Sequence, residues 1–355
     1  METQFLMEKL TLQINGTEYD AAKVVEEMVG GNELWKTKGF EFLIQLQDVS
    51  EFPIKFKTSG TTGTPKEISF SKEQIRKSAT NSCRFFEIKN TDRLFLCLPA
   101  EFVAGRMMMA RALYSKAKLI WKEPSLHPDI ATERINFAAF TPAQVKSIIH
   151  EPNSLQAFEK IDKVIIGGGE ISQSLENELL KLSNSIYATY GMTETLTHVA
   201  VRKIGESVYR SVYDDVKFSV NAARCLEIDI PFISKGKLAT YDVVQLVDEY
   251  SFTWKGRLDN VINSGGIKIY AEELEHKIIQ SGLLKENTFY ITSIKDEQFG
   301  ESPVIVMLKE GVKDDMAVLL TQVNGLLNKH EHVKHVHILD KFELTITGKL
   351  KRQRF

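Results

Sequence analysis

The sequence predicts an α/β fold with a large N-terminal domain, built on a mostly parallel, helix-covered sheet plus a small β layer, and a small α+β C-terminal domain. Three observations predict it. Short apolar strands alternate with amphipathic helices between residues 20 and 240, which is typical of a sheet covered on both faces. From 199 to 255 the pattern changes to short strands with turns. A separate α+β pattern begins near residue 260, so we expect domains over 1–258 and 259–355.

The elements follow from apolar spacing and capping signals. Apolar residues at helical spacing predict a helix over 33–47, and Ser71 with Gln74 forms a capping box that opens a helix to about residue 86. Further helices are expected over 107–113 and 174–182, and strands over 54–57, 94–98, 118–121, 137–140, 164–166 and 186–189. In the second domain, helices are expected over 271–280 and 314–328, and strands over 288–294, 303–308 and 333–339.

Composition excludes several classes of function. With 45 basic and 47 acidic residues, the net charge of −2 gives no reason to expect nucleic acid or an anionic membrane as partner. The apolar stretch 102–114 is too short to span a bilayer and carries Arg106 and Arg111. The first 16 residues lack the apolar run of a signal peptide, and the three cysteines lack metal-ligand or disulfide-framework spacing. We therefore expect a reduced, cytoplasmic compartment and no membrane insertion.

The strongest motif is a Gly-rich, hydroxyl-rich loop that follows the first predicted strand. A glycine-rich loop lets main-chain N–H groups approach phosphate oxygens closely, and the hydroxyls and one lysine add donors and charge. A Walker loop is excluded, because Pro65 and Glu67 occupy the positions that need Gly and Ser or Thr. A surface turn remains the alternative. The expected phosphate-binding residues are Thr58, Ser59, Gly60, Thr61, Thr62, Gly63, Thr64 and Lys66.

This loop resembles that of the adenylate-forming superfamily, which includes acyl-CoA synthetases, firefly luciferase and peptide-synthetase adenylation domains. The family usually has Gly where this chain has Glu67, and an acid beside the phosphate lysine is expected to weaken nucleotide affinity. Other motifs of the family occur in the same order. The resemblance implies that Gly168, Gly169 and Glu170 lie against adenine. It implies that Tyr190, Gly191 and Met192 continue this site, with Tyr190 stacked on the base. In the same motif, it implies that Thr193 contacts the α-phosphate and that Glu194 holds Mg²⁺.

The later motifs complete the resemblance. It implies that Asp242 and Arg257 bind the ribose, that Asp259 is the hinge about which the small domain rotates, and that Lys349 is the catalytic lysine. Gly265 and Gly266 would let the pantetheine of CoA pass close to the backbone. The family usually has Pro at the position of Ala271 and often Pro-Arg at 343–344, where this chain has Glu-Leu. The segment before the phosphate loop is short for the family.

The acyl pocket is expected near Phe102, Arg106 and His198, and Arg111 and Arg202 are further cations that could pair with a second substrate carboxylate. A structural role for these cations is equally open. The stretches 98–108 and 193–198, with the short N-terminal segment, are similar to compact o-succinylbenzoate–CoA ligases of menaquinone biosynthesis. That substrate is an aromatic dicarboxylate, which suits cations beside aromatic and Met side chains.

The resemblance therefore implies an AMP-forming acid:CoA ligase that uses a small carboxylic acid, ATP, Mg²⁺ and CoA, with o-succinylbenzoate as the expected acid. One alternative is an adenylating enzyme that loads another acid onto CoA or onto a carrier-protein thiol. A second is a non-catalytic nucleotide-binding relative, although a binding protein has no need for Lys349. A homodimer is an open expectation.

Overall fold

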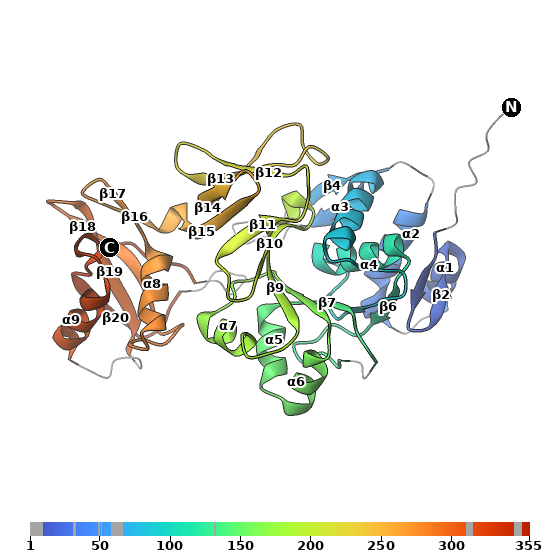
Figure 1. Ribbon diagram of the computed structural model, residues 1–355, viewed down its shortest axis with the longest axis horizontal. Helices are drawn as coiled ribbons and strands as arrows, with labels where there is room; N and C mark the ends of the chain where they lie inside the picture. Colours follow the sequence, from blue (N-terminus) through green and yellow to red (C-terminus); the bar gives the residue numbers. More distant parts are fainter. Residues whose placement is uncertain are drawn as a thin grey trace.

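The computed structural model describes residues 10–30, 33–48, 50, 52–57, 67–130, 133–309, 315–343 and 350–355. Figure 1 shows two bodies along the long axis of the molecule, each with a sheet of its own. The larger body contains the elements up to β15, and the smaller body, at the left of the view, contains β16 to β20. Within the described residues, no helix has the length and apolarity that crossing a bilayer requires.

The large body is organised around one sheet with the strand order β12-β13-β14-β15-β11-β10-β9-β8-β7-β5-β6-β1-β2. The central run from β9 to β1 is parallel. The strands of this run are β1 (Leu12–Ile14), β5 (Arg93–Leu96), β6 (Lys118–Trp121), β7 (Phe137–Phe140), β8 (Lys163–Ile166) and β9 (Ser185–Gly191). At the end of the sheet, β2 (Thr17–Tyr19) pairs antiparallel with β1. A separate hairpin pairs β3 (Ile54–Lys57) with β4 (Glu67–Phe70).

Helices cover both faces of the parallel strands, as predicted. Because side chains alternate along a strand, Leu94 and Leu96 of β5 pack into one buried cluster, whereas Phe95 packs into the cluster on the opposite face. The first face is covered by α2 (Thr37–Gln47), α3 (Lys72–Phe85) and α4 (Val103–Ser115), and the second by α5 (Pro142–Ile149), α6 (Pro152–Glu159) and α7 (Gln173–Leu179). The remaining helix is α1 (Ala21–Gly30), and a 3₁₀ turn, η1 (Leu34–Lys36), precedes α2.

The region 199–255 differs from the prediction of a distinct small β layer. Its strands continue the main sheet in antiparallel fashion, because β10 pairs with the edge of β9 after a tight turn. The continuing strands are β10 (His198–Lys203), β11 (Val208–Ser211), β12 (Lys217–Val220), β13 (Cys225–Asp229), β14 (Leu238–Asp248) and β15 (Ser251–Arg257). The mixed α/β class is confirmed, but the parallel strands make up only its central part.

The small body has its own five-stranded sheet and its own buried cluster, whose residues run from Ile262 to Val333. Its strands are β16 (Val261–Ser264), β17 (Ile267–Tyr270), β18 (Phe289–Asp296), β19 (Gly300–Leu308) and β20 (His335–Leu339), and its helices are α8 (Ala271–Gln280) and α9 (Met316–Leu326). The clusters of the large body contain no residue beyond Phe252 among their fully buried members. This division supports the predicted boundary at 258/259, which stays a prediction.

Candidate nucleotide and substrate site

Two glycine-containing turns lie side by side where β8 and β9 end. Gly167 follows β8, and a Cβ at this position would lie 2.2 Å from the hydroxyl of Thr189 on β9. Gly168 has φ +80°, a conformation that side chains rarely adopt. At the end of β9, a Cβ on Gly191 would lie 2.4 Å from the carbonyl oxygen of Thr197. Adjacent parallel strands thus bring the motif of 167–170 against the motif of 190–194, as the resemblance requires.

The turn after Gly191 is held by hydrogen bonds between its own residues, and it exposes the carboxylate of Glu194. The main-chain N–H of Met192 donates to the Thr195 hydroxyl at 3.0 Å, and this hydroxyl donates to the Thr197 carbonyl at 2.6 Å. Leu196 is fully buried with φ +65°, so its packing holds a sparsely populated backbone conformation. Glu194 is exposed on this turn and makes no hydrogen bond or ion pair with the described residues. Such a carboxylate fits Mg²⁺, which keeps several waters and takes one or two protein carboxylates.

Asp242 is the centre of a polar cluster drawn from three strands. The Tyr190 hydroxyl donates to Oδ2 of Asp242 at 2.7 Å, and Nε1 of Trp254 donates to Oδ1 at 3.3 Å. Nη1 of Arg257 lies 3.4 Å from the same Oδ1, because Asp242 and Arg257 face each other in the register of β14 and β15. The structure therefore brings together Tyr190, Asp242 and Arg257, three of the residues that were predicted to contact the nucleoside.

An aromatic wall supports this cluster. The ring of Tyr190 packs edge-on against Phe252 at 5.2 Å and near Tyr209 at 5.9 Å between centroids. Burial raises the pKa of Tyr190, and the negative charge of Asp242 raises it further. Tyr190 is therefore a protonated donor at neutral pH, and its hydroxyl orients the carboxylate. The stacking of its ring on a base stays a prediction.

The segment after Glu170 contacts the small body through the Ser174 hydroxyl, which donates to Glu286 at 3.2 Å. Desolvation of the Glu170 carboxyl group, followed by the charges of Glu275 and Glu272, raises the pKa of Glu170, and the charge of Arg352 opposes that rise. The side chain of Glu275 is tied to Arg352 by a two-point ion pair. The predicted adenine turn thus lies next to charged groups of the other body.

Two of the most important predictions lie outside the described residues. These are the phosphate loop, residues 58–66, and the catalytic lysine, Lys349. The described flanks of the loop are the paired strands β3 and β4, in which Lys57 faces Glu67. Glu67 forms an exposed ion pair with Lys55 at 3.1 Å, which offsets part of the negative charge that this departure from the family pattern introduces.

Arg111 and His198 form a buried polar group with Ser82. Nε of Arg111 donates to the Ser82 hydroxyl at 2.9 Å, Nη2 donates to the Thr197 hydroxyl at 3.0 Å, and the Ser82 hydroxyl lies 3.1 Å from Nε2 of His198. Since Ser82 accepts from Arg111, its own proton is free to go to His198. Burial and the charge of Arg111 lower the pKa of His198 well below its ordinary value, which keeps the imidazole neutral.

Arg111 is 1% exposed, and no carboxylate of the described residues pairs with its guanidinium. A buried cation without an acidic partner is costly unless an anion joins it. The guanidinium of Arg111 therefore bonds to hydroxyls and has no acidic partner among the described residues, and its predicted pairing with a substrate carboxylate stays a prediction. The group was only partly anticipated, because Ser82 gave no motif signal.

The other predicted substrate cations have partners already. Arg106 donates to the carbonyls of Ala100 and Lys55 at 3.0 and 2.7 Å, and its guanidinium lies over the rings of Phe42 and Phe56. Arg202 forms a two-point ion pair with Glu176 at 2.5 and 2.7 Å, and both side chains are largely buried. The suggestion that Arg202 meets the substrate is not supported. Phe102, the residue before α4, is 44% exposed.

The predicted CoA and hinge residues lie in and beside the small body. Gly265 and Gly266 are the two turn residues of the β16–β17 hairpin, and both have positive φ, as a type I′ turn requires. Asp259 lies in the 3₁₀ turn η3 (Leu258–Asn260), which joins β15 to β16. The placement of both glycines in a small-body hairpin is compatible with their predicted role, which stays untested.

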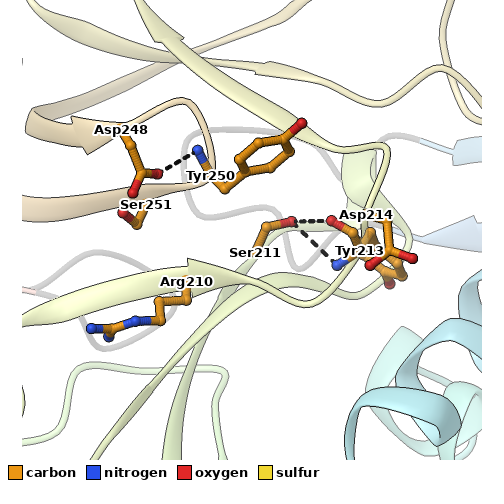
Figure 2. A pocket seen from close by; sticks show the side chains of 7 residues that line it. All are labelled: Arg210, Ser211, Tyr213, Asp214, Asp248, Tyr250 and Ser251. Atoms are coloured by element: carbon orange, nitrogen blue, oxygen red, sulfur yellow. Dashed lines mark hydrogen bonds between the residues drawn. The ribbon is translucent and has the colours of Figure 1, made fainter.

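A cavity of about 440 Å³ lies elsewhere, between the β11 end and the β14–β15 turn (Figure 2). Its polar groups bond to one another: Asp248 accepts from the main chain of Tyr250 at 2.7 Å, and the Ser211 hydroxyl donates to the Tyr213 carbonyl at 2.9 Å. None of the predicted nucleotide or substrate residues lines it. We therefore do not assign the chemistry to this cavity. The motifs missed Trp254, which lies on β15 beside Asp242 of β14 in the predicted nucleoside site, because a single indole carries no spacing signal.

Comparison with known proteins agrees with this geometry. Residues 56–224 match the family model described as AMP-binding enzyme. A relative from Haemophilus influenzae, a 2-succinylbenzoate–CoA ligase, is 26% identical over 75% of this chain and 63% of its own length. The chain therefore spans a little under two thirds of that relative.

Solved structures give the same picture. An acyl-CoA synthetase (AMP-forming)/AMP-acid ligase II-like protein from Dyadobacter fermentans is 26% identical, with a TM-score of 0.64 and coverage of 91% of this chain and 93% of the other. The O-succinylbenzoate coenzyme A synthetase from Bacillus subtilis, in complex with ATP and magnesium ion, has a TM-score of 0.67 at 19% identity, covering 83% of this chain and 68% of the other. The second likeness shows the fold alone.

Proposed function

Because residues 56–224 match the family model described as AMP-binding enzyme, we propose that this chain is an ATP-dependent, AMP-forming acid:CoA ligase. The observation that carries the proposal is the convergence of sequence-distant motifs at one edge of the sheet. Tyr190, Asp242 and Arg257 meet within 3.4 Å, directly beside the turn that presents Glu194. A solvated loop or an unrelated ion pair would not bring together an aromatic ring, a carboxylate suited to accept from ribose hydroxyls and a second, exposed carboxylate at the same edge of the sheet.

In the first half-reaction, the substrate carboxylate attacks the α-phosphorus of ATP and pyrophosphate leaves. Asp242 accepts from the ribose hydroxyls and so fixes the nucleotide in line with the acid. Lys66 and Lys349, both outside the described residues, would neutralise charge on the phosphates. Magnesium held by Glu194 would supply further charge neutralisation at the phosphoryl oxygens.

In the second half-reaction, a thiol attacks the acyl-adenylate carbonyl and AMP leaves. The thiol must come from outside the chain, since burial raises the pKa of Cys83 to about 11 and that of Cys97 to about 12. Cys225 is also buried. Protonated, buried thiols are poor nucleophiles, so the acceptor thiol is an external one, which we propose to be that of CoA. Free thiols also suit a reduced cytoplasm, which we propose as the compartment of this protein. A homodimer remains an expectation from the sequence alone.

For the acid, we propose o-succinylbenzoate. The relatives with this printed activity support it, and so does Arg111, whose buried guanidinium finds no carboxylate among the described residues. A dicarboxylate would send one carboxylate to the α-phosphate and place the other near this guanidinium. Neutral His198 and the surrounding apolar core would receive the ring.

The test is an ATP–pyrophosphate exchange screen across aromatic, dicarboxylic and fatty acids, followed by trapping of active acids with CoA. We expect exchange with o-succinylbenzoate and thioester formation with free CoA. Efficient thioester formation on a phosphopantetheinyl carrier protein but not on CoA would favour the carrier-loading alternative. Nucleotide binding without exchange for every acid would leave a non-catalytic relative as the better description.

A further inference from the structure

The two bodies are joined by a very short connector. β15 ends at Arg257 and β16 begins at Val261, so only the turn Leu258–Asn260 links the two sheets. The buried clusters of the two bodies have no residue in common. Rotation of separately packed bodies is absorbed by a few residues at their junction. Groups that hold this turn therefore bear on the relative orientation of the bodies.

Asp259, in the middle of the connector, is held from both sides by arginines. Its side chain lies 3.5 Å from Nη2 of Arg257, which belongs to the large body. Its main-chain carbonyl accepts from Nη2 of Arg354 at 2.8 Å, and the same nitrogen donates to the Val261 carbonyl at 3.0 Å. Arg354 therefore spans the point where the connector enters the small body.

Arg354 is itself anchored to the small body. Nη1 donates to Oε1 of Glu301 at 2.8 Å, and Oε2 of Glu301 accepts from the main chain of Asn263 at 2.7 Å. The next residue, Phe355, pairs with β18 through its N–H to the Ser293 carbonyl at 3.1 Å and stacks on His337. The guanidinium is thus anchored to the small body, whereas the Asp259 carbonyl belongs to the connector, which also contacts α8 through Asn260 and Glu272 at 2.6 Å.

We propose that Arg354 is a positioning residue that stabilises the present orientation of the two bodies and must release the Asp259 carbonyl when they rotate. The proposal rests on the proposed function, because it assigns the rotation to the change between the two half-reactions. A bond that exists in only one orientation shifts the balance toward that orientation by its own free energy. For a charged, partly exposed donor that shift corresponds to about threefold to tenfold in population.

The same arrangement connects the connector with the nucleotide site. Arg257 divides its guanidinium between Asp242, at 3.4 Å, and Asp259, at 3.5 Å. A ribose that hydrogen-bonds to the Asp242 carboxylate draws on its negative charge and so weakens its attraction for Arg257. Occupation of the nucleoside site therefore changes how firmly Asp259 is held from the large body, while Arg354 holds it from the small body.

The direct test measures the distance between the bodies and needs no catalysis. Spin labels on cysteines introduced at the exposed positions Lys181 and Lys329 report the distance distribution, since the native cysteines are buried. We expect Arg354→Ala to shift the ratio of the distance populations about threefold to tenfold, and Arg354→Lys to shift it less. Arg210→Ala is the matched control, because Arg210 also pairs with one acid and one carbonyl, on Glu206 and Val208, at an exposed site far along the chain.

The second measurement compares rates of adenylate formation with rates of thiolysis of a supplied adenylate. We expect Arg354→Ala to change the ratio of the two rates by about threefold or more and Arg210→Ala to leave it unchanged. A distance distribution identical to that of the unsubstituted chain, or an equal loss in both half-reactions, would overturn the proposal. Absence of exchange by the unsubstituted chain with every acid would instead overturn the proposed function, and the distance measurement would still decide on Arg354.

Discussion

Removal of the Asp242 carboxylate should abolish the ability to distinguish ribose from deoxyribose. We expect wild-type protein to prefer ATP over 3′-deoxy-ATP in pyrophosphate exchange, and Asp242→Ala to lose that preference. The reason is that Asp242 is the acidic group at the nucleoside site and accepts from Tyr190, Trp254 and Arg257 in a fixed orientation. A carboxylate held in this way has lone pairs left for a vicinal diol.

The magnitude follows from the environment of the side chain. The Asp242 side chain is only 17% exposed, so its hydrogen bonds compete weakly with water. A hydrogen bond to a charged group in such a setting contributes about 1.5–3 kcal/mol. At about 1.4 kcal/mol per tenfold, wild-type protein should discriminate by about 10- to 150-fold in kcat/KM. Asp242→Ala should discriminate by less than about threefold, since the group that senses the hydroxyl is gone.

The assay measures pyrophosphate exchange by wild-type protein and by Asp242→Ala, each with ATP and with 3′-deoxy-ATP. Asp248→Ala is the control. Asp248 lies on the same strand but is exposed at the far turn, where it accepts from the Tyr250 main chain. The control should keep the wild-type preference for ATP. If Asp242→Ala still discriminated against 3′-deoxy-ATP as strongly as wild type does, the nucleoside site would have to be placed elsewhere.

Three further predictions test other parts of the site. Lys349→Ala should slow adenylation about 10²–10³-fold and leave thiolysis of a supplied adenylate near the wild-type rate; equal losses in both steps would refute the assignment. Arg111→Met should raise the KM for an aromatic dicarboxylate about 10²-fold or more and change the KM for a matched monocarboxylate little, whereas Arg106→Met, whose partners are carbonyls, should not separate the two acids. His198 is neutral in the folded protein, whereas in the unfolded chain it takes up a proton below pH about 6.5. The free energy of unfolding should therefore fall as the pH drops below that value, by up to about 1.4 kcal/mol per pH unit. His198→Gln should flatten this dependence in denaturant titrations between pH 5 and 8 (about the range in which histidine charge changes), and an unchanged slope would count against a buried neutral imidazole.

Local signals in the sequence were sufficient for most regular elements. The predicted strands over 118–121 and 137–140 and the helix over 271–280 coincide with β6, β7 and α8. The capping box at Ser71 is confirmed, since its hydroxyl accepts from the Gln74 main chain at 3.2 Å and its N–H donates to the Gln74 side chain at 2.8 Å. These features succeed because a capping pair or a run of apolar residues is decided within a few neighbours.

Short or context-dependent elements were missed. β1 and β2 have three residues each, too few for an alternating pattern to stand out, and they are stabilised by pairing with each other and with β6. The strands over 199–255 were recognised as strands, but their union with the main sheet depends on β10 turning back along β9. That pairing is set by the turn after Gly191 and by packing, which local periodicity does not encode.

By itself, the sequence determined the order of the motifs and the chemistry available at each: a hydroxyl-rich loop, a Thr-Glu turn, an acid facing an arginine and a distant lysine. Only the tertiary structure decided which of the candidate cations already have an acidic partner. Arg202 is neutralised by Glu176, which lies 26 residues earlier, whereas Arg111 is buried without an acidic partner among the described residues. The physical reason is that an ion pair depends on which strands and helices become neighbours in space, and these neighbours are fixed by the packing of the whole sheet rather than by residues adjacent in the chain.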